Sequence, residues 1–433
     1  MMAVSTKPYI GTRDFFPEDT AFRNWMFGVQ RDVCRRYSYE EYAAPIVEPL
    51  ESYLAKSSEE IVSEQMYRFK DRGDREVAIR PELTPTLARM VASRAQSLPR
   101  PIRWFNIGNF MRYERPGRGR LREFYQLNVD LLGSAHAAAD VEILMLALDV
   151  LRGYGAGPEH FEVRFSDRRL LGAAFPDRSE EALRSLSRLV DKRDKLKAEE
   201  FDDLLAAELK SPGERAELEA LFSWSIDDLG GRSAELDPVA ENLAFIQSQL
   251  TAHGYQDSVR FDPGIVRGFD YYTGFVFEIY DRDPENRRAL FGGGRYDRLV
   301  GLFGKEDIPA VGFGMGDVTL ENFIRAHDLV PKDLAQPEGV FVALMSDDLR
   351  EDTLRVGLQL RAAGLPTELS LEATRKFGRQ LEQAAKKNRR FVVILGESEL
   401  AAGQVTVKDL VRGEQESVPG DGLIAYLKRA AGG

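Results

Sequence analysis

The chain has 433 residues, 43% of them hydrophobic and 30% charged, and a formal net charge of −11. This length exceeds one ordinary core and predicts about two or three domains, while the acidic balance argues against indiscriminate binding of nucleic acid by the whole surface. The single cysteine, Cys34, excludes an intrachain disulfide. The histidines lie far apart in sequence without metal-ligand spacing, so we expect no metal site built on His and Cys.

The cellular location is predicted from what the sequence lacks. No apolar run approaches the roughly 18 residues that are needed to cross a bilayer. The N-terminal stretch MMAVSTKPYIGTRDFFPED has no apolar signal region and carries acidic residues early. We therefore expect a cytoplasmic protein that does not enter the membrane.

The first half of the chain predicts helices mixed with antiparallel strands. Apolar residues at helical spacing indicate three helices, and Thr84 is a possible N-cap of the second. Two long strands flank a turn rich in glycine and arginine, which is typical of a hairpin. The expected helices are 22–37, 84–97 and 135–155, and the expected strands are 42–50, 101–114 and 122–133.

The second half changes character twice. From about Leu170 to Tyr255 the segment is charged and helical in pattern, which predicts a helical insertion, and strand signals return in VRGFDYYTGFVFEIY and ALFGGGRYDRLV. Beyond the proline-containing VPKDLAQPEG, strands and helices alternate as in a small α/β domain, with QVTVKDL as its edge strand. The predicted domains are a catalytic domain (1–169 and 256–330), a helical insertion (170–255), a linker (331–338) and a C-terminal domain (339–433).

The stretch RYERPGRGRLREFYQ, residues 112–126, places five arginines in fifteen residues of an acidic chain. Such a turn is either simply solvated or built to hold phosphates. Arginine suits phosphate because its planar guanidinium donates two parallel hydrogen bonds. The turn glycines Gly117 and Gly119 would let the backbone approach a ligand closely.

The strand that follows this turn has two different faces. Alternation puts Tyr125, Leu127, Val129 and Leu131 on a core face, and Phe124, Gln126, Asn128 and Asp130 on the other. The second face is either a polar solvent face, which is common on antiparallel strands, or a ligand pocket. If Arg112 of the preceding strand shares that face, the hairpin presents an arginine, an amide and a carboxylate together.

Other segments add features that are weak when taken singly. Arg267 precedes Tyr271 and Tyr272, as in a surface cation–π pair or a pocket. Glu82 and Thr84 stand at a helix start, where they are either capping residues or ligand contacts. Together these residues describe an arginine-rich pocket with carboxylates for an amine and no evident protein nucleophile. That suits attack by a substrate carboxylate on the α-phosphate of ATP, helped by positioning and electrostatics.

At these residues the chain resembles the histidyl-tRNA synthetases, a family of class II aminoacyl-tRNA synthetases. The resemblance covers nearly the whole chain, from GTRDFFPED through Pro45 in the motif 1 region, RPELTPT and the motif 2 hairpin RYERPGRGRLREFYQLNVDLLG. It continues through VRGFDYYTG and GGGRYD to a C-terminal domain similar to the family's anticodon-binding domain. It implies an α+β catalytic domain with a mixed, mostly antiparallel sheet, a helical insertion and an α/β anticodon-binding domain.

The resemblance also implies the activity and the partners. A ligase of this family activates L-histidine with ATP to histidyl-adenylate and transfers it to the terminal ribose of tRNA(His). Mg²⁺ would arrive with ATP, held mostly by phosphates and water, without a dedicated protein metal site. The resemblance further implies a homodimer built through motif 1.

Carried over residue by residue, the resemblance implies two adjoining substrate sites. Arg112 would bridge the histidine carboxylate and the α-phosphate, and Arg267 would steady that phosphate, so that these two are the implied catalytic residues. The residues implied for histidine are Glu82, Thr84, Arg112, Gln126, Asp130, Arg267, Tyr271 and Tyr272, with Glu82 and Thr84 on the amino group and Asp130 with a tyrosine on the imidazole. Those implied for ATP are Arg112, Glu114, Arg120, Phe124 and Arg267, with Phe124 stacked on adenine, and Arg115 and Gly117 would approach the tRNA acceptor end.

One segment departs from the family's pattern. Motif 3 usually ends in a Glu-Arg pair whose arginine contacts the γ-phosphate of ATP, but VGFGMGDVTLENF has Val318 and Thr319 there. Arg295 or Arg325 is a hypothetical replacement. The departure favours an alternative reading, a non-catalytic, histidine-sensing regulatory subunit of ATP phosphoribosyltransferase. The retained Arg267, the intact motif 2 loop and the complete C-terminal domain favour the enzyme, and the two histidine signatures disfavour another class II synthetase.

Overall fold

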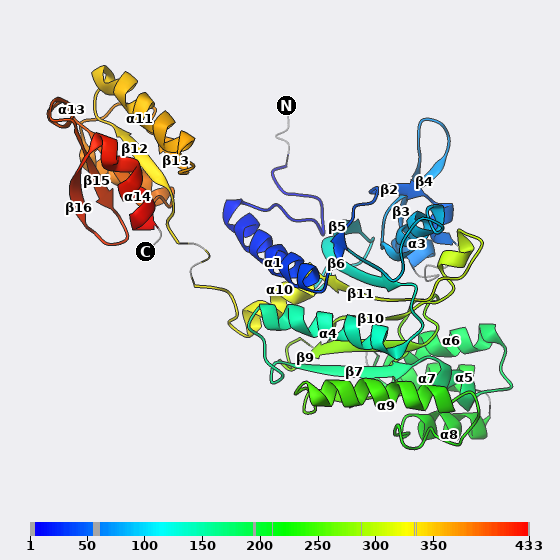
Figure 1. Cartoon of the computed structure of the whole chain (residues 1–433). Coiled ribbons are helices and arrows are strands. Elements are labelled where there is room, and N and C mark those ends of the chain that lie inside the picture. Colours follow the sequence, from blue (N-terminus) through cyan, green and yellow to red (C-terminus); the bar gives the residue numbers. More distant parts are fainter. Residues whose placement is uncertain are drawn as a thin grey trace. The chain divides into compact units, whose positions relative to one another are not determined.

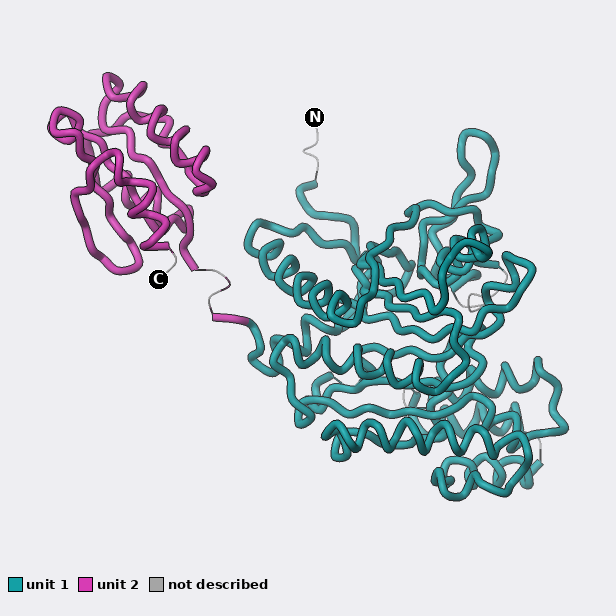
Figure 2. Tube along the Cα trace, viewed as in Figure 1, with its two compact units in different colours: residues 1–330 teal, residues 331–433 magenta. Residues whose placement is uncertain are grey.

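The computed structural model describes residues 5–54, 61–193, 196–209, 211–286, 288–332, 334 and 336–431. The chain divides into two compact units, residues 1–330 and 331–433, which Figure 2 shows in different colours. Each unit has its own β-sheet structure and its own buried core. Within the described residues, no helix is both long enough and apolar enough to span a bilayer.

The first unit is built on an eight-stranded sheet in the order β1-β5-β6-β11-β10-β9-β7-β8. The β1–β5 and β7–β8 pairs are parallel and the other described pairs of this sheet are antiparallel. This confirms the expected mixed, mostly antiparallel sheet. The strands are β1 (Glu40–Glu41), β5 (Ile102–Met111), β6 (Glu123–Leu132), β7 (Phe161–Asp167), β8 (Val259–Phe261), β9 (Phe275–Asp281), β10 (Ala289–Arg295) and β11 (Ala310–Gly316).

One face of this sheet is covered by helices. The helix α4 (Ala137–Gly153) packs against β6 and β11, and it lies beside α1 (Pro17–Arg36) and α9 (Asp237–Ala252), as Figure 1 shows. The predicted core positions Leu127, Val129 and Leu131 of β6 are at most 1% exposed. Each Å² of apolar surface that these residues bury stabilises the folded state by roughly 25 cal/mol. The helical layer therefore fixes one face and leaves the other for a site.

The segment between β7 and β8 is helical. Its helices are α5 (Arg169–Ala174), α6 (Glu180–Val190), α7 (Ala198–Glu208), α8 (Pro212–Leu221) and α9. Ser211 caps α8, since its side chain accepts a hydrogen bond from the Glu214 amide while the Glu214 carboxylate faces the Ser211 amide. The remaining helices of this unit are α2 (Glu51–Leu54), α3 (Thr84–Ser93), α10 (Asp317–Ala326), a π-turn at Ile61–Gln65 and a short 3₁₀ turn at Val300–Leu302.

The strand predicted over 42–50 was too long, because only 47–49 of that range form a strand. The structure instead places β1 in the large sheet and β2 (Val47–Pro49) in a separate three-stranded sheet, β2-β4-β3, with β3 (Tyr67–Lys70) and β4 (Glu76–Ile79). Pro45 lies between β1 and β2, and a proline cannot donate a ladder hydrogen bond. The chain changes sheets at that point, and the hairpin β3–β4 was not anticipated.

The second unit holds a five-stranded sheet in the order β13-β12-β14-β15-β16. QVTVKDL, expected at the edge, is β15 and lies between β14 and β16, because the unanticipated β16 continues the sheet. The strands are β12 (Val340–Leu344), β13 (Thr367–Leu369), β14 (Phe391–Leu395), β15 (Gln404–Asp409) and β16 (Gln415–Pro419). The helices are α11 (Arg350–Ala362), α12 (Phe377–Lys386), α13 (Glu397–Ala401) and α14 (Leu423–Ala431), with short 3₁₀ turns at Asp347–Leu349 and Gly420–Gly422.

Candidate active site

Two cavities adjoin on the face of the large sheet opposite α4. The small cavity, about 120 Å³, is lined from β6, β10, β11, the start of α3 and the segment that precedes β9. The large cavity, about 620 Å³, is lined by the loop after β5, the π-turn at Ile61–Gln65, residues of the helical segment and the same segment before β9. Arg112, Arg267 and Phe269 line both cavities, so these three residues stand where the cavities meet.

The hairpin β5–β6 brings the predicted polar face together. Its register pairs Phe110 with Phe124 and Gly108 with Gln126, and the Arg112 amide donates to the carbonyl of Arg122. Arg112 therefore shares the face of Gln126, and both line the small cavity. Asn128 and Asp130 are only 7% and 5% exposed. This face is a pocket wall and not a solvent face.

The floor of the small cavity is made of glycines inside central strands. The run in ALFGGGRYD lies within β10, where Gly292 pairs with Gly314 and Gly294 with Gly312 of β11. A Cβ on Gly312 would lie 2.2 Å from Oδ1 of Asp130, and one on Gly314 would lie 2.7 Å from Nε2 of Gln126. The glycines are needed because the side chains of β6 lie across the backbone of β11.

Asp130 is the buried acid of the small cavity. The hydroxyl of Tyr296 donates to Oδ1 of Asp130 over 2.5 Å. Burial raises the pKa of Asp130 to about 7, although the hydrogen bond from Tyr296 acts in the opposite direction. A buried carboxylic group that titrates near neutrality can change its charge when a basic ligand such as an imidazole binds beside it.

Arg267, at the junction of the cavities, has an unusual backbone conformation and a paired side chain. Its backbone adopts a φ of 59°, a left-handed conformation that is uncommon for a residue with a side chain. Its Nη1 donates to Oε1 of Glu278 over 2.5 Å. Burial would lower the pKa of Arg267, but the charge of Glu278 raises it well above the ordinary value. The guanidinium is therefore a permanent cation, and among the described residues its buried Nε has no hydrogen-bond partner.

The helical segment holds the loop that carries Arg267. Arg168 Nη1 donates to the carbonyl of Phe269 over 2.5 Å, and Arg188 forms an ion pair of 2.6 Å with Asp270. Arg168 also donates to Ser187 Oγ over 3.0 Å. These contacts tie the loop to α6, which gives the insertion a direct link to the site.

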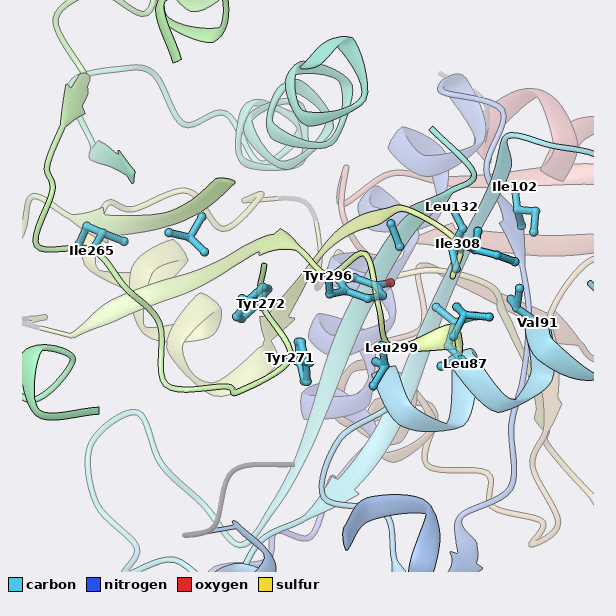
Figure 3. Packing of buried hydrophobic residues seen from close by; sticks show 14 residues of the cluster. Leu87, Val91, Ile102, Leu132, Ile265, Tyr271, Tyr272, Tyr296, Leu299 and Ile308 are labelled. Carbon is cyan, nitrogen blue, oxygen red and sulfur yellow. The ribbon is translucent and has the colours of Figure 1, made fainter. Parts of the chain in front are cut away.

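The two tyrosines of this loop are buried. Tyr271 and Tyr272 are 6% and 8% exposed, which excludes a surface cation–π pair, and their ring centroids are 4.8 Å apart. Figure 3 shows both near Tyr296 within one cluster of buried side chains. Burial raises the pKa of Tyr271 and of Tyr272, so both hydroxyls stay protonated at neutral pH.

The start of α3 differs from the expected capping arrangement. The N-cap position is Leu83, which makes no side-chain cap, and Thr84 is the first helical residue, followed by a proline. The helix ends at Ser93, earlier than predicted. Thr84 and the buried Glu82 instead line the small cavity, where Thr84 interacts with the hydroxyl of Tyr271. Their side chains thus face the small cavity.

The structure brings together the predicted histidine residues completely and the predicted ATP residues in part. All eight residues predicted for histidine line the small cavity, and Arg112, Glu114, Arg120 and Arg267 line the large one. Arg120 forms an ion pair of 3.2 Å with Glu114. Phe124 lies outside the lining of both cavities, stacked on Phe110 with the Arg112 guanidinium 5.3 Å from its ring centre.

The residues predicted for the tRNA acceptor end lie at the tip of the hairpin. Gly117 forms an isolated bridge with Arg120, and a Cβ on Gly117 would meet no atom within 4 Å among the described residues. Arg115 is exposed. Neither residue lines the small or the large cavity. They face outward, as a contact to a macromolecule would require.

Thr319 lies in the first turn of α10, and neither proposed replacement for the motif 3 arginine lies near the cavities. Arg295 is 7% exposed and pairs with Asp140 at 2.8 Å, on the α4 side of the sheet. Arg325 pairs with Glu321 at 2.9 Å, and its guanidinium lies 4.4 Å from the ring centre of Phe22. The geometry therefore contradicts both hypotheses.

Sequence reasoning missed several lining residues. Tyr296 stood in the quoted GGGRYD, whose tyrosine was a usable signal, and Asn128 was placed on the correct face without a role. Arg188 and Lys192 come from the helical segment and line the large cavity. No local pattern marks them, because only the tertiary fold brings α6 to the loop.

Known proteins are similar to this chain over nearly its whole length. A model of the histidyl-tRNA synthetase family matches residues 11–318, and a model of an anticodon-binding domain matches residues 339–430. A histidine–tRNA ligase of Leptospira biflexa is 43% identical over 95% of both chains, and one of Haloarcula marismortui is 39% identical over 94% of both. The crystal structure of a histidyl-tRNA synthetase from Nostoc sp. PCC 7120 superposes with a TM-score of 0.79 at 25% identity, covering 99% of this chain and 100% of that one.

These matches extend over both compact units and over every motif that lines the cavities. They favour the enzyme over the regulatory-subunit alternative, because the named relatives are ligases that match at nearly full length. The chain belongs to the histidyl-tRNA synthetase family.

Proposed function

We propose that this chain activates L-histidine with ATP and transfers the histidyl group to tRNA(His), using the two adjoining cavities. The observation that carries the proposal is that Arg112 and Arg267 line both cavities. A carboxylate in the small cavity and a phosphate in the large one would meet between two guanidinium groups. Such a junction stabilises negative charge that develops during attack on phosphorus.

The small cavity suits histidine. Glu82 and Thr84 offer oxygen acceptors for the amino group, and Asp130 with its Tyr296 partner offers a carboxylate for the imidazole. Gln126, Tyr271 and Tyr272 supply the remaining wall. Buried groups of this kind reject analogues that cannot replace their hydrogen bonds, since an unpaired buried polar group is costly.

The large cavity suits ATP. Arg112 and Arg267 would hold the α-phosphate, Arg120 and Glu114 would position the nucleotide, and Phe124 would stack on adenine. Mg²⁺ would arrive with ATP, held mostly by phosphates and water. The carboxylates that line this cavity and could complete its oxygen shell are Glu64, Glu114, Asp191 and Glu278. Bound there, Mg²⁺ would neutralise phosphate charge.

The proposed reaction has two steps and needs no protein nucleophile. A carboxylate oxygen of histidine attacks the α-phosphorus while the bond to the β-phosphate oxygen breaks, which yields histidyl-adenylate and pyrophosphate. The terminal ribose hydroxyl of the tRNA then attacks the carbonyl carbon, and AMP leaves. Arg112 and Arg267 orient the reacting groups in the first step and hold the adenylate for the second.

The wider assignments complete the proposal. Arg115 and Gly117 would meet the acceptor end of the tRNA, the unit 339–433 would bind the anticodon, and the helical insertion 170–255 would act as a clamp on the acceptor arm. The catalytic domain would comprise 1–169 and 256–330, joined by the linker 331–338. We further propose a homodimer formed through the motif 1 region, acting in the cytoplasm.

The test is histidine-dependent exchange of pyrophosphate into ATP by the purified protein, followed by charging of tRNA with the histidine anticodon. Exchange together with charging is the expected result. Histidine binding without exchange would contradict the proposal and favour the regulatory subunit, for which the specific observation is Thr319 in place of the motif 3 arginine.

A further inference from the structure

The position of the missing motif 3 arginine is occupied by a side chain that is engaged internally. Thr319 Oγ1 donates to the carbonyl of Leu290 over 2.7 Å. A Cβ added to Gly119 would lie 3.2 Å from the Thr319 methyl carbon, so the motif 2 loop passes directly over this residue. Thr319 has no charge to offer a phosphate, and its hydroxyl proton is already donated.

A third cavity of about 150 Å³ lies at this meeting point. Its lining includes Gly119 of the motif 2 loop, Thr319 of α10, and Arg288 and Leu290 at the start of β10. Arg288 directly precedes β10 and its side chain is exposed. Arg288, from the β9–β10 connection, therefore lines the same cavity as Thr319, which stands at the position of the motif 3 arginine.

Arg288 is also coupled to the large cavity. Partial loss of hydration around the guanidinium and the charge of Arg120 lower the pKa of Arg288, and the charge of Glu114 acts in the opposite direction. Arg120 and Glu114 both line the large cavity, where we place ATP. The Arg288 guanidinium is thus close enough to the ATP residues to interact with their charges.

Arg288 differs from the neighbouring arginines because they form ion pairs with carboxylates and it does not, within the described residues. Arg120 pairs with Glu114 at 3.2 Å, and Arg118 pairs with Glu285 at 3.0 Å. Within the described part of the chain, Arg288 forms no ion pair or hydrogen bond. A cation beside another cation is stabilised when a multivalent anion lies between them, and a guanidinium binds phosphate with two parallel hydrogen bonds.

We propose that Arg288 binds the γ-phosphate of ATP in place of the absent motif 3 arginine. The positive charge reaches the phosphate tail from the β9–β10 connection instead of from the first turn of α10. The proposal rests on the proposed ATP site, and it assigns to Arg288 a role in binding that neither Arg295 nor Arg325 can fill from its position.

The test compares substrates that carry a γ-phosphate, or the pyrophosphate derived from it, with ligands that lack it. In Arg288→Ala we expect the KM values for ATP and for pyrophosphate in the exchange reaction to rise on the order of ten- to hundredfold, the loss expected for a hydrogen bond to a charged group. Inhibition by AMP and transfer from preformed histidyl-adenylate to tRNA should stay unchanged. Arg288→Lys, which keeps the charge and loses the fork, should give an intermediate KM for ATP.

Arg325→Ala is the matched control, because it removes one positive charge from α10 beside an acidic partner, away from the cavities. It should leave the KM for ATP unchanged. Unchanged KM values for ATP and pyrophosphate in Arg288→Ala would overturn the proposal. An equal weakening of AMP binding would do the same, because it indicates a merely structural role, and a rise confined to the KM for tRNA would assign Arg288 to the tRNA. If the unaltered protein showed no exchange, the proposed function itself would fail, which is a separate result.

Discussion

The small and the large cavity adjoin, yet they are lined by different secondary-structure elements and different types of residue. The small cavity is a wall of strand residues over a glycine floor, with Asp130 only 5% exposed. The large cavity is lined by loops and helix residues with several formal charges, including Arg120, Arg188 and Lys192. The small cavity thus offers hydrogen bonds from groups on a sheet, whereas the large cavity offers mostly charged groups, and under the proposed function the first would select histidine and the second would bind the phosphates of ATP.

This contrast predicts which kinetic quantity each change will alter. Groups confined to the small cavity should change the binding of histidine, and groups confined to the large cavity should change the binding of ATP. The two arginines at the junction line both cavities, and under the proposed function they would stabilise the negative charge that develops between the substrates. They should therefore change the rate of activation at saturating substrates.

The largest kinetic effect is expected when the Arg267 side chain is removed, because Arg267 lines both cavities. In Arg267→Ala we expect kcat of activation to fall on the order of 10²- to 10³-fold, the effect of losing one donor to a developing oxyanion. The measurement is pyrophosphate exchange at saturating histidine and ATP. Arg267→Lys is the comparison variant, because it keeps the charge beside Glu278 and loses only the planar fork. A normal kcat with a raised KM for histidine alone would assign Arg267 to the small cavity only.

The next largest effect is expected on the binding of histidine in the small cavity. In Asp130→Asn we expect the KM for histidine to rise on the order of ten- to hundredfold, because the carboxylate that would pair with the imidazole is replaced by a neutral amide. The KM for ATP should change little, since Asp130 does not line the large cavity. Both constants come from the same exchange assay. Equal changes in the two KM values would argue against separate cavities.

A smaller effect tests the glycine floor. In Gly312→Ala the new methyl would lie 2.2 Å from Oδ1 of Asp130 and 2.6 Å from the carbonyl oxygen of Val129, so Asp130 must move. We expect the KM for histidine to rise about tenfold, since small displacements of positioning groups weaken productive binding. Gly28→Ala in α1 is the control, because its Cβ meets no described atom within 4 Å and alanine favours helices. Wild-type kinetics in Gly312→Ala would show that the floor tolerates a side chain.

Local sequence patterns predicted the elements that carry most of the small cavity. Alternation along β6 separated Gln126 and Asp130 from the core positions, and the hairpin register placed Arg112 on their side. These predictions succeeded because strand geometry fixes side-chain direction within one element. The glycine run was harder, since a strand interior and a turn look alike until the crowding by neighbouring strands is known.

The large cavity was less predictable for a physical reason. Its walls come from segments that are far apart in sequence, and the ion pair between Arg188 and Asp270 exists only because α6 packs near the loop before β9. The passage of the chain from the large sheet at β1 to the three-stranded sheet at β2 likewise depends on tertiary pairing. No local sequence pattern marked Arg288, because it lies near Thr319 only where the motif 2 loop, the start of β10 and α10 come together in the fold.

The last effect concerns stability without ligands and follows from the buried acid of the small cavity. Burial raises the pKa of Asp130 from 3.8 to about 7. Below pH 3.8 Asp130 is protonated in both the folded and the unfolded state, so its ionisation does not change the free energy of unfolding there. Between that pH and about 7 the unfolded chain releases the proton while the folded chain keeps it, so the free energy of unfolding falls as pH rises.

Asparagine carries no such proton, so Asp130→Asn should gain stability over the unaltered protein as pH rises, on the order of a few kcal/mol above neutrality. The measurement is thermal unfolding of both proteins without ligands at several pH values from mildly acidic to mildly basic. The difference in Tm should grow across this range and then level off once Asp130 is ionised in both states. A difference that stays constant would mean that Asp130 is ionised throughout, and that the small cavity is as tolerant of charge as the large one.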